Sequence, residues 1–359
     1  MKTFDLYIIR KFLGTFMFMI IAFVIVAVVF DVSENIDDLL QSNAAAHEII
    51  FDYYLNFCFY FGNLLSSFIV FLSVIWVTSK LAQQSEIIAM LAGGVSYRRI
   101  ILPYFMAAAA LVALSLTLSH LVVPGANRTK LDFELKYLKG DLNVADRNIH
   151  REVEPGTLVH FRTVSLEKQS GTQFSLEKWE NGRLVMKING GSAARDSINN
   201  LWTITNADVR YFYSDGSERV YHRERLDTAL NLSISKFAER SEVVSTMSNA
   251  QLNQYLAQEK SGGSGRIAFI EIEKFSRTSN AFGIFVLTLI GVSVSSRKSR
   301  GGTGFHLFLA LVIGLFFVFI SRFATVAATN VGFPTSVAVW VPNMIFLLVG
   351  IALFWRAQK

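Results

Sequence analysis

The residues that could do chemistry in this 359-residue chain are spaced in a way that excludes the common catalytic and nucleotide-binding sites. The glycine-rich runs at 262–265 and 301–304 lack the Lys-Ser/Thr pair with which a phosphate-binding loop holds a nucleotide. The six histidines show no metal-ligand spacing, and H-E-x-x-H, C-x-x-C and G-x-S-x-G do not occur. Energy for any work by this protein must therefore come from a partner or an ion gradient.

Ionisable residues are rare in the apolar stretches that could cross a membrane. Arg322 and His120 are the exceptions, and His120 is interpreted as an interfacial polar residue rather than a base. Charges inside spans mark ion paths, so their scarcity argues against a proton-coupled carrier. Cys58 is the only cysteine, which excludes a disulfide within the chain.

Composition divides the chain into two apolar blocks around one polar block. Hydrophobic residues make up 52% of it, and a span needs about 20 apolar residues. We predict a membrane protein of residues 1–123 (three spans), 124–265 (a β domain and connecting helix) and 266–359 (three spans). The predicted spans are Phe12–Phe30, Leu55–Thr78, Ile100–Val122, Ala281–Val294 with an earlier start, Phe305–Val326 and Val337–Phe354.

Basic residues set the predicted orientation, because they concentrate on the cytoplasmic side of a membrane. With six spans, four basic segments fall on one side, whereas the segment 31–53 on the other side has six acidic residues and no Lys or Arg. We therefore expect both termini in the cytoplasm and the β domain outside it. The basic residues are Lys2, Arg10, Lys11, Lys80, Arg98, Arg99, Arg297, Lys298, Arg300, Arg356 and Lys359.

The polar block reads as strands without intervening helices, which indicates a sandwich, jelly roll or partial barrel. Glu180-Asn181-Gly182 is a strong hairpin turn signal. Val209, Tyr211 and Tyr213 share one strand face and form either the core or an apolar slot for acyl chains. The expected strands are Thr157–Val164, Gln173–Trp179, Arg183–Ile188, Trp202–Tyr213, Val220–Arg225 and Ala229–Ile234.

A helix should follow the strands, since Ser248 and Gln251 fit a capping box. Gly262-Gly263 breaks it, and a second helical pattern from Ile267 leads into the fourth span. This connection is either a hinge or an ordinary tether.

A short amphipathic helix is expected near residues 85–94, between the second and third spans. Ser85 could cap it and Glu86 lies in its first turn, where a carboxylate favours the helix dipole. Ile87, Met90 and Leu91 are expected on one face, and Gly93-Gly94 ends the helix. Such a helix either rests in the lipid headgroups or inserts into a partner protein.

The run 85–96, SEIIAMLAGGVS, is similar to the coupling segment of the lipopolysaccharide-export permeases, the LptF/LptG (YjgP/YjgQ) family. The resemblance extends over nearly the whole chain. It includes YIIRKFL at 7–13, VVPGAN at 122–127, Pro334 and WVPN at 340–343, in the family's order.

The resemblance implies six transmembrane helices with a periplasmic β-jelly-roll domain inserted between helices 3 and 4, in the bacterial inner membrane. Two related permeases would form a pseudo-dimer, and an LptB-like ATPase dimer carrying ATP and Mg would bind the coupling helices. This chain would hold no cofactor, catalyse no reaction and bind no nucleic acid. An LptA-like periplasmic bridge would receive lipopolysaccharide, and an LptC-like single-helix subunit could join. The implied ATPase contacts are Glu86, the main polar one, with Ile87, Ala89, Met90 and Gly93.

Arg322, Lys274 and Arg277 are the predicted substrate contacts. They fall near the outer headgroup level, where a guanidinium suits a lipid A phosphate, although Arg322 could instead snorkel to the surface. The chain departs from the family in lacking a proline before the fourth span and in the acidic residues 31–38 after the first. That acidic cluster either binds divalent cations or is a solvated loop.

The sequence also raises two alternatives to a transport permease. A scaffold or sensor could hold a β domain at the membrane without transporting anything. An intramembrane enzyme is disfavoured because no catalytic constellation is present. An amphipathic helix facing the cytoplasm favours the transport permease over the scaffold, which needs no such helix.

Overall fold

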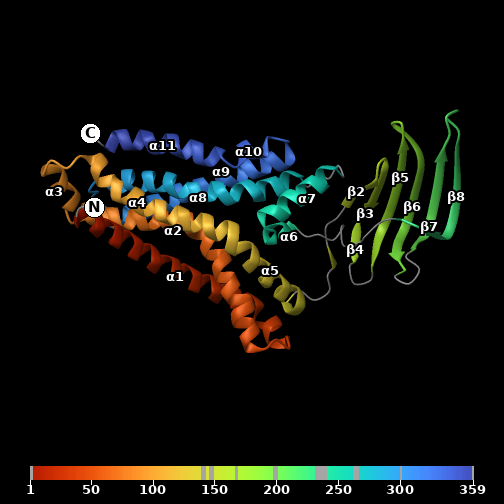
Figure 1. Ribbon diagram of the computed structural model, residues 1–359, viewed down its shortest axis with the longest axis horizontal. Coiled ribbons are helices and arrows are strands. Elements are labelled where there is room, and N and C mark those ends of the chain that lie inside the picture. The colour runs from red at the N-terminus through yellow and green to blue at the C-terminus, as the bar shows by residue number, and fades with distance from the viewer. Residues whose placement is uncertain are drawn as a thin grey trace. The chain divides into compact units, whose positions relative to one another are not determined.

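The computed structural model describes residues 3–138, 143–144, 149–165, 169–196, 201–230, 241–261, 267–299 and 301–357. Within them, six helical stretches are long and apolar enough to cross a membrane, and the strands of an antiparallel sheet follow the third and precede the fourth along the sequence (Figure 1). The predicted fold class, six spans in a 3+3 order with a β domain of the jelly-roll kind between them, is confirmed. The stretches are Thr3–Gln41, Glu48–Gln83, Tyr97–Leu138, Ile267–Ser295, Gly302–Asn330 and Thr335–Ala357.

Several stretches consist of more than one element. The single helices are α1 (Thr3–Gln41), α8 (Ile267–Ser295) and α9 (Gly302–Asn330). The second stretch joins the π-helical η1 (Glu48–Tyr54) to α2 (Leu55–Gln83), and the sixth joins α10 (Thr335–Ala338) to α11 (Val341–Ala357). The third contains α4 (Tyr97–Thr117), η2 (Leu118–Val122), α5 (Val123–Phe133) and η3 (Glu134–Leu138).

Two spans extend well beyond their predicted ends. The third was expected to end at Val122, but the helix continues past Pro124 to Leu138. Proline removes a backbone donor and normally stops or kinks a helix, and here the π-helical turn η2 directly precedes it. Helix α1 likewise continues beyond Phe30 to Gln41, so the acidic residues 31–38 lie on a helix rather than in a loop.

Helices α2 and α8 form the centre of the helical unit. A Cβ added at Gly291 of α8 would lie 2.9 Å from Cγ1 of Val74 on α2, so the two backbones approach closely there. By contrast, α1 and α9 expose most of their large apolar side chains, among them Phe18 and Phe319. Apolar surface of this extent is expected for helices that face lipid or another membrane helix.

Both chain ends lie at one end of the helical unit, together with the short helix α3 (Glu86–Ala92) (Figure 1). The Asp5 carboxylate binds Arg99 at the start of α4, with a nitrogen–oxygen distance of 2.6 Å. The Tyr97 ring packs on Phe354 near the C-terminus, and the Tyr97 hydroxyl donates to Ser296 after α8. The basic segments that were predicted to share one side of the membrane therefore meet at one end.

The chain forms two compact units. The helical unit contains Met1–Phe133, Ser245–Ala250 and Ala268–Lys359, and the β unit contains Glu134–Val244 and Gln251–Ile267. The connecting helices are α6 (Ser241–Thr246) and α7 (Asn249–Ser261), which begins directly after Ser248, at the predicted capping box. The predicted break at Gly262-Gly263 lies outside the described residues.

In the β unit the strand order is β1-β4-β5-β6-β7-β8, and the hairpin β2–β3 joins through β3 to β5. The predicted strand Thr157–Val164 appears as β3 and β4, interrupted at Arg162, and β2 was missed. The last expected strand, Ala229–Ile234, lies mostly outside the described residues. The strands are β1 (Asn143–Val144), β2 (Ile149–Glu154), β3 (Thr157–Phe161), β4 (Thr163–Ser165), β5 (Ser170–Glu180), β6 (Arg183–Arg195), β7 (Trp202–Phe212) and β8 (Glu218–Thr228).

The sheet curls around its own core. Phe161 on β3 and Trp202 on β7 are separated by two strands, yet their ring centroids lie 5.9 Å apart. A flat sheet would separate them by about 14 Å, so the sheet rolls up. The hairpin signal is confirmed, since Glu180 pairs with Arg183 across Asn181 and Gly182. Both turn residues have positive φ, as a type I′ turn requires.

Candidate functional site

Helix α3 is joined to α2 by two residues only, Gln84 and Ser85. Ser85 has φ of 60°, in the left-handed region, and its side chain makes no capping hydrogen bond. The expected Ser85 cap is therefore wrong, because so short a joint needs Ser85 to reverse the chain. Gly94, with φ of 83°, ends the helix as predicted. Ser96 then caps α4 by accepting a hydrogen bond from the Arg99 backbone at 3.4 Å.

The seven-residue helix α3 turns one side toward the helical core and the other outward. Ile87 is only 2% exposed and packs into the core, with Met90 partly buried against the same cluster. Ile88 and Leu91 are 51% and 42% exposed. Leu91 therefore does not share a face with Ile87 and Met90, as the helical spacing had suggested.

Of the predicted coupling residues, three are accessible and two face inward to different degrees. Ala89 and Gly93 are exposed and Glu86 is partly exposed, whereas Ile87 is buried and Met90 half-buried. Sequence reasoning missed Ile88 and Leu91 as outward residues. Apolar residues fill α3 after Glu86, so helical periodicity alone could not tell the inner face from the outer one.

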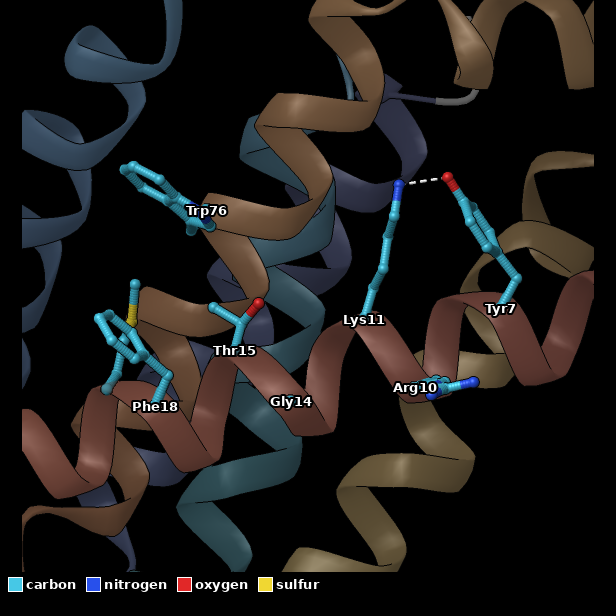
Figure 2. Close-up of a pocket in the computed structure, with 8 residues that line it drawn as sticks. Tyr7, Arg10, Lys11, Gly14, Thr15, Phe18 and Trp76 are labelled. Atoms are coloured by element: carbon cyan, nitrogen blue, oxygen red, sulfur yellow. Dashed lines mark hydrogen bonds between the residues drawn. The ribbon is translucent and has the colours of Figure 1, made fainter.

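Glu86 is held by two residues of α1. The Tyr7 hydroxyl lies 3.0 Å and 3.2 Å from the two carboxylate oxygens of Glu86, and Lys11 Nζ lies 3.8 Å from one of them. Figure 2 shows Lys11 and Tyr7 pointing toward one another, and the lysine donates to the Tyr7 hydroxyl. The Glu86 side chain remains about one-third exposed, at 32%. A carboxylate held in one orientation yet open to solvent is suited to accept hydrogen bonds from a partner.

A bidentate ion pair between Arg99 and Asp5 lies at the same end of the helical unit as Glu86. Arg99 donates from both terminal nitrogens to the two Asp5 oxygens, at 2.6 Å and 2.7 Å. The Asp5 side chain is only 4% exposed, so the pair is stronger than a surface salt bridge. It ties the first turn of α1 to the first turn of α4.

Arg277, one of the predicted substrate contacts, is buried and fully engaged. Its side chain is 6% exposed and pairs with Glu273 at 3.1 Å. Its terminal nitrogens donate to the backbone oxygens of Met247 and Ser245 at 2.9 Å and 3.3 Å. Arg277 thus holds the segment that leads out of the β unit onto α8, and a lipid phosphate would have to displace these partners.

The other two predicted contacts are more accessible. Arg322 is exposed on α9, and Lys274 is half-buried with its ammonium 5.6 Å from the Phe275 ring centroid. By helical rise, all three cations lie about 27 to 31 Å from the end of the unit that holds α3. They share a level, but the structure brings no direct contact between Arg322 and the other two.

His120 makes structural contacts, as the sequence reading favoured. Its ring nitrogens contact the Asn249 side chain at 2.8 Å and the Thr278 hydroxyl at 3.3 Å. Within the described residues, no group of three or more His, Cys, Asp or Glu side chains is placed to hold a metal ion. The acidic residues 31–38 accordingly form no such group there, and Asp31 accepts a hydrogen bond from the Tyr53 hydroxyl at 3.2 Å.

No curated protein matches the chain. A family model described as "Lipopolysaccharide export system permease LptF/LptG" matches residues 6–356, which include all or nearly all of every helical stretch and the whole β unit. The chain therefore belongs to the LptF/LptG family of lipopolysaccharide export permeases.

Proposed function

We propose that this chain is the permease subunit of an ABC transporter that extracts lipopolysaccharide from the bacterial inner membrane and passes it to a periplasmic bridge. A separate ATPase, with its own ATP and Mg, supplies the energy. The observation that carries this proposal is α3, a short helix whose outward face is apolar and whose first residue is a partly exposed carboxylate held in place.

The proposed orientation puts α3 and both termini in the cytoplasm. Basic residues of four segments meet at that end, and such residues favour the cytoplasmic side. The β unit follows the opposite end of the third span, so it would lie in the periplasm. A soluble ATPase would then reach α3 directly from the cytoplasm.

The proposed ATPase contact combines one polar anchor with an apolar surface. Glu86 would accept hydrogen bonds from a basic or amide group, and Tyr7 and Lys11 keep its carboxylate oriented for that purpose. Ile88 and Leu91, flanked by Ala89 and Gly93, would fill an apolar cleft of the ATPase. Buried Ile87 and half-buried Met90 would hold α3 to the bundle rather than touch the partner.

On the cargo side, we assign the direct phosphate contact to Arg322. It is exposed, it would lie at the level of the outer headgroups in the proposed orientation, and its fork of donors suits a lipid A phosphate. Lys274 would add charge at the same level, while Arg277 keeps the exit from the β unit in place. The apolar faces of α9 and of the part of α1 beyond Met19 would be covered by the sister permease of a pseudo-dimer, and by an LptC-like helix where one is present.

The β unit offers a surface for the bridge. Within the described residues β8 pairs on one side only, with β7. A strand edge of this kind can be extended by a strand of another protein. On the core face beside it, Val209 is buried, but Tyr211, Tyr213 and Tyr221 are 39%, 47% and 44% exposed. The core interpretation therefore fits Val209, whereas the tyrosines remain available to acyl chains.

Co-purification with ATPase activity tests the proposal. Tagged chain extracted in mild detergent should bring down an ATPase, and Glu86→Ala should lower both capture and lipid-stimulated ATP hydrolysis. The paired change Ile88→Ser with Leu91→Ser should do the same by removing the apolar contact. Lys298→Gln, an exposed cation at the same end but outside α3, is the matched control and should change neither.

The outcome separates the permease from a scaffold. Full ATP hydrolysis in the complex carrying both the Glu86 and the Ile88/Leu91 changes would remove α3 as the coupling element. Failure of the wild-type chain to capture any ATPase, under conditions that keep its sister permease bound, would favour a scaffold that presents a β unit at the membrane.

A further inference from the structure

A groove lies along α1 at the end of the helical unit that holds α3, and the function proposed above uses only Tyr7 and Lys11 of its lining, to hold Glu86. It has a volume of about 740 Å³ and is lined by α1 residues together with Trp76 of α2. Figure 2 shows Tyr7, Lys11, Thr15 and Phe18 along one side of α1, with Trp76 on the neighbouring helix. This volume falls within the range of pockets that bind small molecules.

The length of the groove along α1 is close to the thickness of the hydrocarbon part of one lipid leaflet. Its α1 lining runs from Tyr7 to Phe18, which at about 1.5 Å per residue is roughly 16 Å. Half of a bilayer hydrocarbon core is about 15 Å thick. With the first turn of α1 at the headgroup level, the groove would reach to near the middle of the membrane.

Charge and apolar surface are separated along this length. Arg10 and Lys11 line the outer part, and Arg10 is exposed. Phe18, Met19 and Trp76 line the remainder, and Trp76 is 40% exposed. Between them, Gly14 leaves the floor open, since an added Cβ there would meet nothing within 4 Å. A guanidinium and an ammonium above an aromatic trough match an anionic head on an acyl chain.

We propose that this groove binds one acidic glycerophospholipid, with its phosphate at Arg10 and Lys11 and an acyl chain along Gly14, Phe18 and Trp76. Lys11 also contacts the Tyr7–Glu86 pair, so the lipid head and α3 share one cation. The inference depends on the proposed orientation only for naming the leaflet as cytoplasmic. It needs neither an ATPase nor lipopolysaccharide export.

Quenching of Trp76 by brominated lipid tests the proposal in the full-length chain. The protein is placed in phosphatidylcholine nanodiscs with a low, equal mole fraction of acyl-brominated phosphatidylglycerol or phosphatidylcholine. The Trp76 signal is the difference between the wild type and Trp76→Phe. Because a basic residue favours an acidic lipid about fivefold, brominated phosphatidylglycerol should quench Trp76 several times more effectively than brominated phosphatidylcholine.

Two variants and two controls sharpen the measurement. Arg10→Gln should abolish the preference for the acidic lipid, and Gly14→Leu should reduce quenching by either lipid because it fills the floor. Arg98→Gln removes an exposed cation at the same end but outside the groove, and should keep the preference. Gly304→Leu fills a similarly open helical site on α9 and should leave quenching unchanged.

Three results would overturn the proposal. Equal quenching by the two brominated lipids removes the phosphate site, and equal losses in Arg10→Gln and Arg98→Gln reduce the effect to general surface charge. Relief of phosphatidylglycerol quenching by added lipopolysaccharide would assign the groove to the cargo instead. ATPase capture by the same preparations is measured in parallel, so that a failure of the lipid site is distinguished from a failure of the proposed function.

Discussion

The two ends of the helical unit use charged residues in different ways. At the end that holds α3, Glu86 and Lys11 are about one-third exposed, and Lys11 lines a groove. At the opposite end, Arg277 is buried and its donors are taken by Glu273 and by the backbone of the segment that leads from the β unit. The first arrangement leaves charges available to another molecule, whereas the second holds two parts of the chain together.

This difference shows that the type of residue does not determine its role. Arginines and lysines occur at both ends, and sequence patterns grouped Arg277 with exposed Arg322. Burial and partners separate them, because a buried charge must be paired within the protein, whereas an exposed charge is free to bind outside it.

The largest expected effect is at Arg277. Arg277→Gln should destabilise the chain by about 3 kcal/mol, because it breaks a buried ion pair and removes the hydrogen bonds that Arg277 donates to the carbonyls of Met247 and Ser245. Thermal unfolding in detergent, followed by tryptophan fluorescence, measures the change. Lys274→Gln is the control and should have a much smaller effect. Similar melting temperatures for the two variants would remove the distinction between the two ends.

A smaller loss is expected at Asp5, a buried charge of the α3 end. Asp5→Asn should lower the melting temperature by less than Arg277→Gln, because the neutral amide keeps one hydrogen bond to Arg99 but loses the bidentate pair. Arg99 is also more exposed than Arg277 and can be solvated by water. A loss larger than that of Arg277→Gln would show that both ends are held by structural ion pairs.

The β unit contains a titratable side chain, His160, whose surroundings change its pKa. His160 on β3 faces His150 on β2 at 4.3 Å between ring centroids, with Glu177 and Lys187 nearby. Burial lowers the pKa of His160 below its usual 6.5, and His150 and Lys187 lower it further against the opposing effect of Glu177. The unfolded chain therefore takes up this proton more readily than the folded one. Above about pH 6.5 His160 is neutral in both states and does not lower the free energy of unfolding. As the pH falls below that value, the free energy of unfolding decreases.

Local hydrogen exchange of β2 and β3, corrected for intrinsic rates, should show this decrease between about pH 7.5 and pH 5.5. His160→Gln should flatten the pH dependence. His222→Gln, on the exposed strand β8, should retain it. An unchanged slope in His160→Gln would contradict the assignment.

The smallest effect on stability is expected at Tyr7. Tyr7→Phe removes the hydrogen bond to Glu86 on an exposed side chain and should alter stability by less than about 0.5 kcal/mol. It should nevertheless weaken ATPase capture if the orientation of Glu86 matters to the partner. Combined measurements of melting temperature and capture on Tyr7→Phe and Glu86→Ala separate the two contributions. A large stability loss would make the α3 end resemble the Arg277 end.

Hydropathy predicted the centres of the six spans but not their ends. It predicted Phe12–Phe30 where α1 runs from Thr3 to Gln41, because the polar turns at each end carry no apolar signal. The third span passes Pro124 because a π-helical turn precedes the proline, and a local sequence pattern does not report such a turn. The hairpin at Asn181 and Gly182 was predictable, since its turn type depends on those two residues alone.

The candidate site was predictable in place but not in detail. Glu86 and the glycines after Ala92 located α3 correctly. Its partner Tyr7 is 79 residues away in the sequence, and the backbone partners of Arg277 are about 30 residues away, so only the folded chain brings them together. The Ser85 cap failed because the length of the joint, rather than residue preference, determined its conformation.

The joint between α2 and α3 has a mechanical consequence. The joint has only two residues, one of them in the left-handed conformation, so it has little freedom to change its shape. The inner face of the short helix is fixed in the core by Ile87. A push on α3 therefore cannot be absorbed by bending the connection. It would instead pass to the helices that flank α3, and on the α2 side the tight crossing at Gly291 and Val74 links α2 to α8 in the middle of the bundle.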